Sequence, residues 1–170
     1  MGLQGIAVYV LRATAFAAAV TLVYALILRV CSKPLSAGHL IPVFYFAALI
    51  EITVLRGGVD WGAIGCFDCR APRLRPFRTT MEEFRRGVWP FLYHVAGNLA
   101  WFIPVGLILR RKPVWMAFLG GLMLSVLIES LQWVLNTGMT DVDDVIYNSG
   151  GALLGWLMAR AIPRRLSKAM

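Results

Sequence analysis

The sequence predicts an all-α membrane protein, a bundle of about five transmembrane helices with one long polar loop between the second and the third. Of the 170 residues, 59% are hydrophobic and only 15% are charged, whereas soluble domains average about 25% charged residues. The mean hydropathy is +0.69. Because the apolar residues are gathered into long runs, they favour membrane spans over one soluble core. With no internal repeat, residues 1–170 are expected to form a single domain.

The first two apolar runs predict a pair of spans joined by a short turn. The first span covers about residues 6–28 and contains Arg12. It lacks a preceding basic segment, so we expect a retained helix and no cleaved signal peptide. The second covers about residues 39–55 and carries Glu51 near its end. This run is short for a hydrocarbon core of about 30 Å, so it either spans the membrane or re-enters it.

The long connection over residues 56–89 contains a lone CxxC pair, Cys66 and Cys69. One such pair without further Cys or His ligands is a weak zinc motif. A small loop disulfide and two free thiols both remain open, and so does the redox state of the pair.

The end of this connection predicts a short surface helix. Thr80 and Glu83 have the spacing of a capping box, which starts a helix that ends near Gly87. Its Arg and Phe content suits the membrane interface. An ordinary solvated loop is the alternative.

Three further spans follow, at about residues 90–109, 114–135 and 142–162. Dense Lys and Arg clusters close the first, third and last of the five runs, at one end of the bundle. Such clusters favour the cytoplasmic side, so we predict the N-terminus outside and the C-terminus inside. Anionic lipid and this orientation rule account for the net charge of +8, which excludes nucleic acid as the expected partner.

Polar residues lie at helical spacing at the other end of the apolar runs. They are Ser125, Glu129, Gln132 and Asn136, then Asp141, Asp144 and Asn148, then His94 and Asn98, and finally Arg12 and Glu51. Chain direction places all of them in the N-terminal-side half of the membrane, where we predict a polar cup that opens outward. Asp143 is expected to face away, because only Asp141 and Asp144 share a helix face.

Plainer explanations remain open for the same residues. First-turn acids complement a helix N-terminus, which accounts for Asp141, Asp143 and Asp144. Interhelical hydrogen bonds without chemistry account for Asn98, Gln132 and Asn148.

Two features inside the last helices are more specific. Glu129 lies most of two turns inside its helix, so its carboxylate needs Arg12, His94, a hydrogen bond, water or a proton. Gly151 and Gly155 are four residues apart and indicate close helix packing.

Three segments together resemble the VanZ-like family. They are NLAWFIPVG (98–106), IESLQ (128–132) and TDVDDVIYNSGGALLG (140–155), in the family's order and spacing. The segment LRPF (74–77) is similar to a fourth family element, but Arg73 stands where Asn is usual. The motif residues that carry over are Asn98, Phe102, Pro104, Gly106, Glu129, Gln132, Asp141, Asp143, Asp144, Asn148, Gly151 and Gly155.

The resemblance implies a multi-pass protein of the bacterial plasma membrane, linked to low-level resistance to the glycopeptide teicoplanin. We expect the polar cup to bind a polar or lipid-linked headgroup, such as a cell-wall precursor, or the glycopeptide itself. The expected ligand-binding residues are Asn98, Glu129, Gln132, Asp141, Asp144 and Asn148. Membrane lipids are the other expected partners, and the oligomeric state stays open.

A membrane-embedded enzyme acting on an envelope lipid headgroup is the alternative. Glu129 would be its general base, with Asp144 and His94 as further catalytic candidates. Asp141 and Asp144 are the residues that could hold a divalent metal, although no cofactor is predicted. A small transporter is disfavoured, because the sequence has no inverted repeat.

Overall fold

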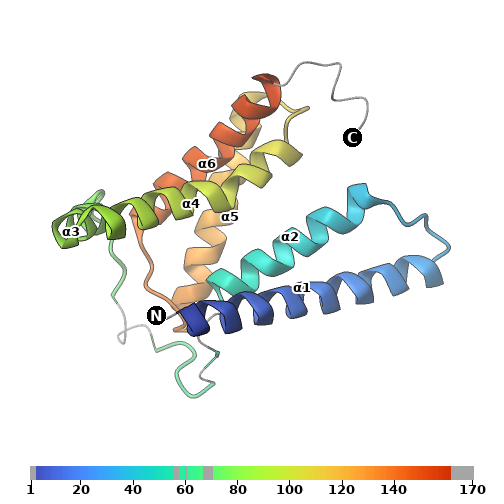
Figure 1. The fold of residues 1–170 in the computed structure, drawn as a ribbon, viewed down its shortest axis with the longest axis horizontal. Helices are drawn as coiled ribbons and strands as arrows, with labels where there is room; N and C mark the ends of the chain where they lie inside the picture. Colours follow the sequence, from blue (N-terminus) through green and yellow to red (C-terminus); the bar gives the residue numbers. More distant parts are fainter. Residues whose placement is uncertain (1–2, 56–57, 60, 67–70, 162–170) are drawn as a thin grey trace.

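The computed structural model describes residues 3–55, 58–59, 61–66 and 71–161, with residues 3–6 as backbone only. These residues form helices α1 (Leu3–Val30), α2 (Ala37–Thr53), α3 (Arg78–Arg86), α4 (Val88–Ile108), α5 (Val114–Val134) and α6 (Val142–Ala161) (Figure 1). Within the described ranges the only β-type pairing is an isolated parallel bridge between Arg73 and Asp141. The predicted all-helical architecture is therefore confirmed.

Among the described residues, three helices are long and apolar enough to cross a membrane: Ala7–Val30, Val88–Ile108 and Val114–Val134. Helix α2 is apolar but has only 17 residues, and α6 carries Asp143 and Asp144 in its first turn. A membrane protein agrees with these helices, while a count of five spans stays a prediction. All five long helices coincide with the predicted apolar runs to within a few residues.

The helices form two groups that meet at one end (Figure 1). Helices α1 and α2 make an antiparallel hairpin, and α4, α5 and α6 pack as a bundle. The two groups meet where α2 and α5 both end. There, the Nε2 amide of Gln132 on α5 donates a hydrogen bond to the carbonyl of Thr53 on α2, at 3.0 Å. The turn of the hairpin lies far from the bundle.

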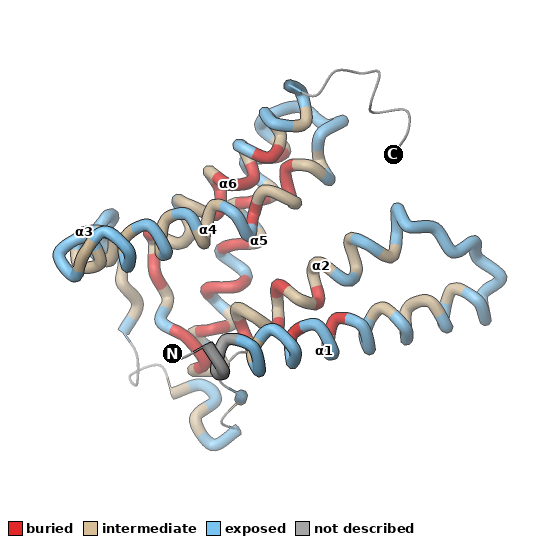
Figure 2. The backbone as a smooth tube through the Cα atoms, in the orientation of Figure 1, coloured by how far each residue is buried: buried red, intermediate tan, exposed pale blue. Residues whose placement is uncertain are grey.

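Burial follows this arrangement (Figure 2). The buried core joins the end of α2 to the bundle and consists of Leu49, Val54, Phe102, Val105, Ile128 and Ala152. Much of α1 is exposed, including the apolar side chains of Leu11 and Leu22. Apolar side chains exposed along a helix of this length are expected to face lipid.

Helices α4 and α6 approach to backbone contact. A Cβ added at Gly155 would lie 2.0 Å from the carbonyl oxygen of Ile103, and one at Gly151 would lie 2.2 Å from that of Leu99. From the other helix, a Cβ at Gly106 would lie 1.9 Å from the carbonyl oxygen of Ala152. Only glycine permits this separation, which is how small residues promote packing between membrane helices.

The described residues of the connection between α2 and α4 include a helix and a backbone contact with the start of α6. The helix is α3, in agreement with the expected short helix, although α3 starts at Arg78 and ends at Arg86. Before α3, the Arg73 amide donates to the carbonyl of Thr140 and the Val142 amide donates to the carbonyl of Arg73, at 2.8 and 3.0 Å. The connection is thereby attached to the start of α6.

The cysteines differ in state. Cys66 is disulfide-bonded, whereas Cys31 is a free, exposed thiol. Cys69 lies outside the described residues.

Candidate functional site

The segment that leads into α6 is held by Glu129 of α5. The Asp141 amide donates to Glu129 Oε2 at 2.8 Å, and the Thr140 hydroxyl donates to the Glu129 carbonyl at 3.0 Å. Glu129 is 4% exposed. Of the partners expected for the Glu129 carboxylate, the structure shows a hydrogen bond, from the Asp141 amide. This bond holds the residue that precedes α6 against α5.

Arg12 has a different partner. Its Nε lies 2.6 Å from Glu51 Oε1, and its Nη2 donates to the carbonyl of Leu55 at 2.9 Å. This pair ties α1 to the end of α2, where the free carbonyls of a helix attract a cation.

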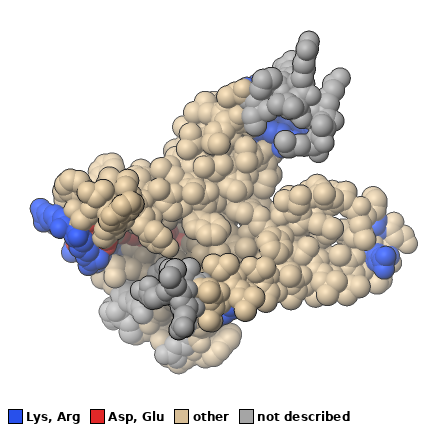
Figure 3. Space-filling model, in the orientation of Figure 1, with Lys and Arg blue, Asp and Glu red and all other residues tan. Residues whose placement is uncertain are grey.

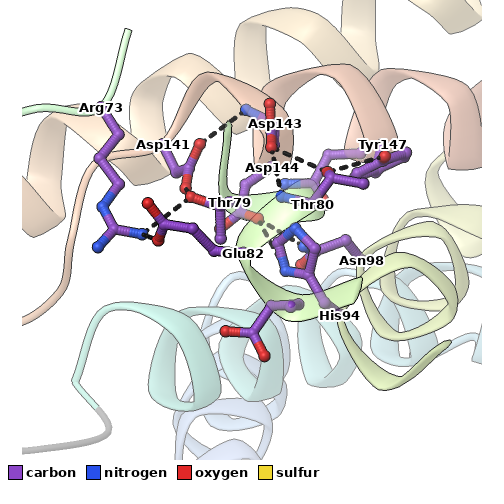
Figure 4. A network of polar contacts seen from close by, with 12 residues as sticks. Arg73, Thr79, Thr80, Glu82, His94, Asn98, Asp141, Asp143, Asp144 and Tyr147 are labelled. Carbon is purple, nitrogen blue, oxygen red and sulfur yellow. Dashed lines mark hydrogen bonds and ion pairs between the residues drawn. The ribbon is translucent and has the colours of Figure 1, made fainter. Parts of the chain in front are cut away.

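Asp143 is fully buried and binds the N-terminus of α3 (Figure 4). Its carboxylate accepts from the Phe77 amide, from the Thr80 amide at 2.9 Å and from the Thr80 hydroxyl at 2.8 Å. All three donors come from Phe77 and Thr80, so α3 occupies the side of α6 to which Asp143 points.

This contact also replaces the predicted capping box. The residue before α3 is Phe77, whose φ of 61° is left-handed and whose side chain makes no capping bond. The Thr80 hydroxyl donates to Asp143 and so is turned away from the backbone amide that a capping box requires. A carboxylate from α6 thus satisfies the free amides that an N-cap side chain usually satisfies.

Asp141 caps its own helix. One carboxylate oxygen accepts from the Asp143 amide at 2.9 Å, and the other accepts from the Thr79 hydroxyl. The bond to an amide two residues ahead is the usual N-cap geometry. For Asp141 and Asp143, the geometry therefore favours the helix-capping alternative over an open binding site.

Asp144 differs from its neighbours. Asn98 donates its Nδ2 to Asp144 Oδ1 at 2.6 Å, and His94 Nδ1 lies 3.7 Å from the same oxygen (Figure 4). The Asp144 side chain is 26% exposed and that of His94 is 15% exposed. Tyr147 packs edge-on against the His94 ring, and its hydroxyl lies 3.0 Å from that of Thr80. We call His94, Asn98 and Asp144 the outer polar site.

The remaining predicted residues lie elsewhere. Asn148 donates to Ser125 Oγ at 2.8 Å and links α6 to α5, while Gln132 links α5 to α2. In the described part of the chain, the side-chain carbonyl oxygens of both amides lack a hydrogen-bond partner. The two residues act as ties between helix pairs, so the predicted cup divides into the outer polar site and these separate contacts.

Two cavities in the described structure are apolar and are not lined by these residues. One of about 380 Å³ is lined by Phe16, Val20, Val43, Phe46, Ala47 and Ile50. The other, of about 270 Å³, is lined by Leu109, Trp115, Met116, Leu119, Gly120 and Met123. Neither offers polar groups to a headgroup.

Two arginines, Arg73 and Arg78, lie beside Glu82 of α3. Arg73 Nη1 lies 2.9 Å from Glu82 Oε2 and donates to the Thr79 hydroxyl at 3.0 Å. Arg78 lies 3.0 Å from Glu82 Oε1. The hydrogen bond from Arg78, with the charges of Arg73 and Arg78, lowers the pKa of Glu82 below its ordinary value despite partial desolvation.

Sequence reasoning did not identify Thr79 of α3 or Tyr147 of α6 as part of the network, and it gave Thr80 only a capping role within its own helix. The only signal was the likeness of LRPF to a family element. Arg73 stands where the family usually has Asn, but this does not affect how the segment is attached to the start of α6. The hydrogen bonds to Thr140 and Val142 are made by the backbone of Arg73 and not by its side chain.

The observed geometry can be set beside known proteins. Residues 41–163 match the protein family described as VanZ/LLP1. No curated protein and no solved structure matches the chain significantly. The match covers most of the chain and all the residues labelled in Figure 4, but not Arg12. The chain therefore belongs to the VanZ/LLP1 family.

Proposed function

We propose that this VanZ-like protein binds a polar or lipid-linked headgroup at the outer polar site and thereby changes susceptibility to glycopeptides such as teicoplanin. The observation that carries the proposal is the contrast among the acids. Asp143 is 0% exposed and Glu129 4%, with backbone donors on both, whereas the Asp144 side chain is 26% exposed. A ligand can reach Asp144 without displacing a helix cap.

The chemistry of the outer polar site indicates the kind of headgroup. A carboxylate accepts hydrogen bonds from hydroxyl and ammonium groups and repels phosphate. His94 Nε2 is buried without a hydrogen-bond partner among the described residues, and a ligand hydroxyl or amine admitted beside the ring would supply one, with the direction of the bond set by the tautomer. These groups suit the sugar hydroxyls or amines of a lipid-linked cell-wall precursor.

The proposed location is the outer face of the bacterial plasma membrane, with the N-terminus outside and the C-terminus in the cytoplasm. The polar ends of α2, α4, α5 and α6 lie together, at the same end as α3 (Figure 1). Cys66 lies nearby, because the amide of the preceding Gly65 donates to the carbonyl of Val134 at the end of α5, at 2.9 Å. A disulfide at Cys66 supports an oxidising compartment on this side, since cytosolic thiols stay reduced.

The test is Asp144→Asn, which keeps the shape of the side chain and removes its charge. Losing one hydrogen bond to a charged group lowers affinity roughly 10- to 100-fold. We expect teicoplanin susceptibility of a sensitive host to return to that of cells without the protein, at equal membrane insertion. Glu83→Gln is the matched control, because it removes the same charge from a carboxylate that pairs with Arg86 within α3. Unchanged susceptibility for Asp144→Asn would contradict the proposal.

The enzyme alternative retains one supporting observation, the approach of His94 to Asp144 at 3.7 Å. A carboxylate beside an imidazole orients a general base. Asp144 and His94 carry this alternative better than Glu129 does, since Glu129 Oε2 holds the Asp141 amide. Within the described residues, no group of three His, Cys, Asp or Glu side chains converges as metal ligands do.

Purified protein incubated with undecaprenyl-linked and phospholipid substrates tests this alternative. Turnover that His94→Gln abolishes would favour the enzyme. Binding without turnover would favour the headgroup receptor.

A further inference from the structure

Helix α3 is placed by its neighbour at the surface of the membrane. Gly87 is both the last cap of α3 and the first cap of α4, with a φ of 138° that favours glycine. Because α4 is apolar from its first residues and long enough to span, the chain leaves the hydrocarbon core where α3 ends. Helix α3 therefore lies close to the lipid headgroups.

The side of α3 that faces the protein is determined by the polar network. Thr79 and Thr80 point toward Asp141 and Asp143 (Figure 4). On a helix, residues 78, 81 and 85 share the opposite face, at spacings of three and four. Arg78, Met81 and Arg85 are exposed there.

Apolar and aromatic side chains flank this face. Met81 is 50% exposed and Phe84 57%, and Trp89 on the first turn of α4 is 81% exposed. Exposing three such side chains to water costs free energy. At a bilayer surface this arrangement is usual, because the apolar side chains lie among the acyl chains and Trp lies at the level of the headgroups.

The charge on this surface is positive and only partly neutralised. Glu82 is shared by Arg73 and Arg78, and Glu83 pairs with Arg86. Arg75 and Arg85 are exposed, and in the described structure neither has an ion-pair partner. Figure 3 shows Lys and Arg at this end, and further basic side chains at the turn between α1 and α2 and at the far end of the bundle, with a largely uncharged surface between them.

We propose that α3 and its flanks bind anionic phospholipid, with Arg75 and Arg85 on the phosphates and with Met81 and Phe84 among the acyl chains. This surface is separate from the outer polar site, whose Asp144 repels phosphate. It takes a lipid of the bilayer, and its charges select lipids with a net negative headgroup over zwitterionic ones.

The experiment places a reporter on α3 of the full chain. A bimane is attached at Met81→Cys in a Cys31→Ser background, since Cys31 is the free, exposed thiol and Cys66 is disulfide-bonded. Labelled protein is put in phosphatidylcholine nanodiscs with increasing brominated phosphatidylglycerol or brominated phosphatidylcholine. Quenching of the bimane reports which lipid lies next to α3.

We expect quenching by both lipids, with phosphatidylglycerol preferred up to roughly fivefold for each arginine. The preference should fall in high salt, because exposed charges are screened. Arg75→Gln with Arg85→Gln should remove it. Arg110→Gln with Arg111→Gln makes the same charge change beyond the far end of α4, and should leave it intact.

Three outcomes would overturn the proposal. Absence of quenching by either lipid would mean that α3 is not at the bilayer surface. Equal quenching by the two lipids in the unaltered background would mean that the arginines do not select charge. Loss of the preference in the Arg110 and Arg111 control as well would assign it to the overall charge of the protein.

Discussion

Removing the Asp143 carboxylate should release α3 from the bundle without unfolding the long helices. The carboxylate accepts from the Phe77 amide and from the amide and hydroxyl of Thr80, and Asp143 is 0% exposed. In Asp143→Ala both amides lose their acceptor at a buried position. In Asp143→Asn one carbonyl oxygen remains, so the loss should be smaller.

The magnitude follows from the kinds of contact. A lost N-cap costs about 1 kcal/mol, and a lost hydrogen bond to a charged group about 1.5–3 kcal/mol. These values overlap, because the cap is one of the hydrogen bonds, so we expect about 3 kcal/mol for Asp143→Ala. That corresponds to roughly a hundredfold faster amide exchange in α3, as each 1.4 kcal/mol is a factor of ten.

Hydrogen exchange read by mass spectrometry on peptides covering Arg78–Arg86 measures this directly. Glu83→Gln is the control on the same helix, since an exposed pair such as Glu83 with Arg86 contributes about 1 kcal/mol or less. Protection of α3 that is unchanged in Asp143→Ala, or lost equally in the control, would refute the idea that Asp143 holds α3.

Three other predictions test the helix contacts and the orientation. Gly155→Ala puts a Cβ 2.0 Å from a backbone carbonyl of α4 and should lower stability in detergent by about 3 kcal/mol or more, whereas Gly97→Ala, with no atom within 4 Å of its new Cβ, should be neutral or stabilising. Arg12→Met should destabilise by leaving a carboxylate with 6% of its side chain exposed, and adding Glu51→Leu should restore much of the loss in chemical unfolding. An impermeant maleimide should label Cys31 only after cells are opened, because the predicted orientation puts the α1–α2 turn in the cytoplasm; labelling of intact cells would reverse that orientation.

The helices were predictable because their signal is local. Residues 114–134, for example, carry a single charged residue, Glu129, over the length of a membrane span, and no distant residue is needed to recognise such a run. Chain direction also placed the polar residues at one end, where Arg12 now meets Glu51 and Glu129 meets the start of α6. Which side chain contacts which was open, since Arg12 was one of several partners expected for Glu129.

The acids show the limit of spacing rules. Helical periodicity correctly separated Asp143 from Asp141 and Asp144, but it could not show that another helix occupies the side to which Asp143 points. The capping-box prediction failed for the same reason. Thr80 and Glu83 have the right spacing, yet a carboxylate 63 residues away along the chain takes the Thr80 donors.

By itself, the sequence determined that this is a helical VanZ/LLP1 protein whose polar residues gather at one end of its apolar helices. The helices and the position of the polar residues follow from composition and from order along the chain, whereas the family follows from the match over residues 41–163. Only the tertiary structure decided that Asp141 and Asp143 cap helices and that Asp144 stays accessible beside His94 and Asn98. The physical reason is that every buried carboxylate must find donors, and here the donors of Asp143 come from a helix distant in sequence.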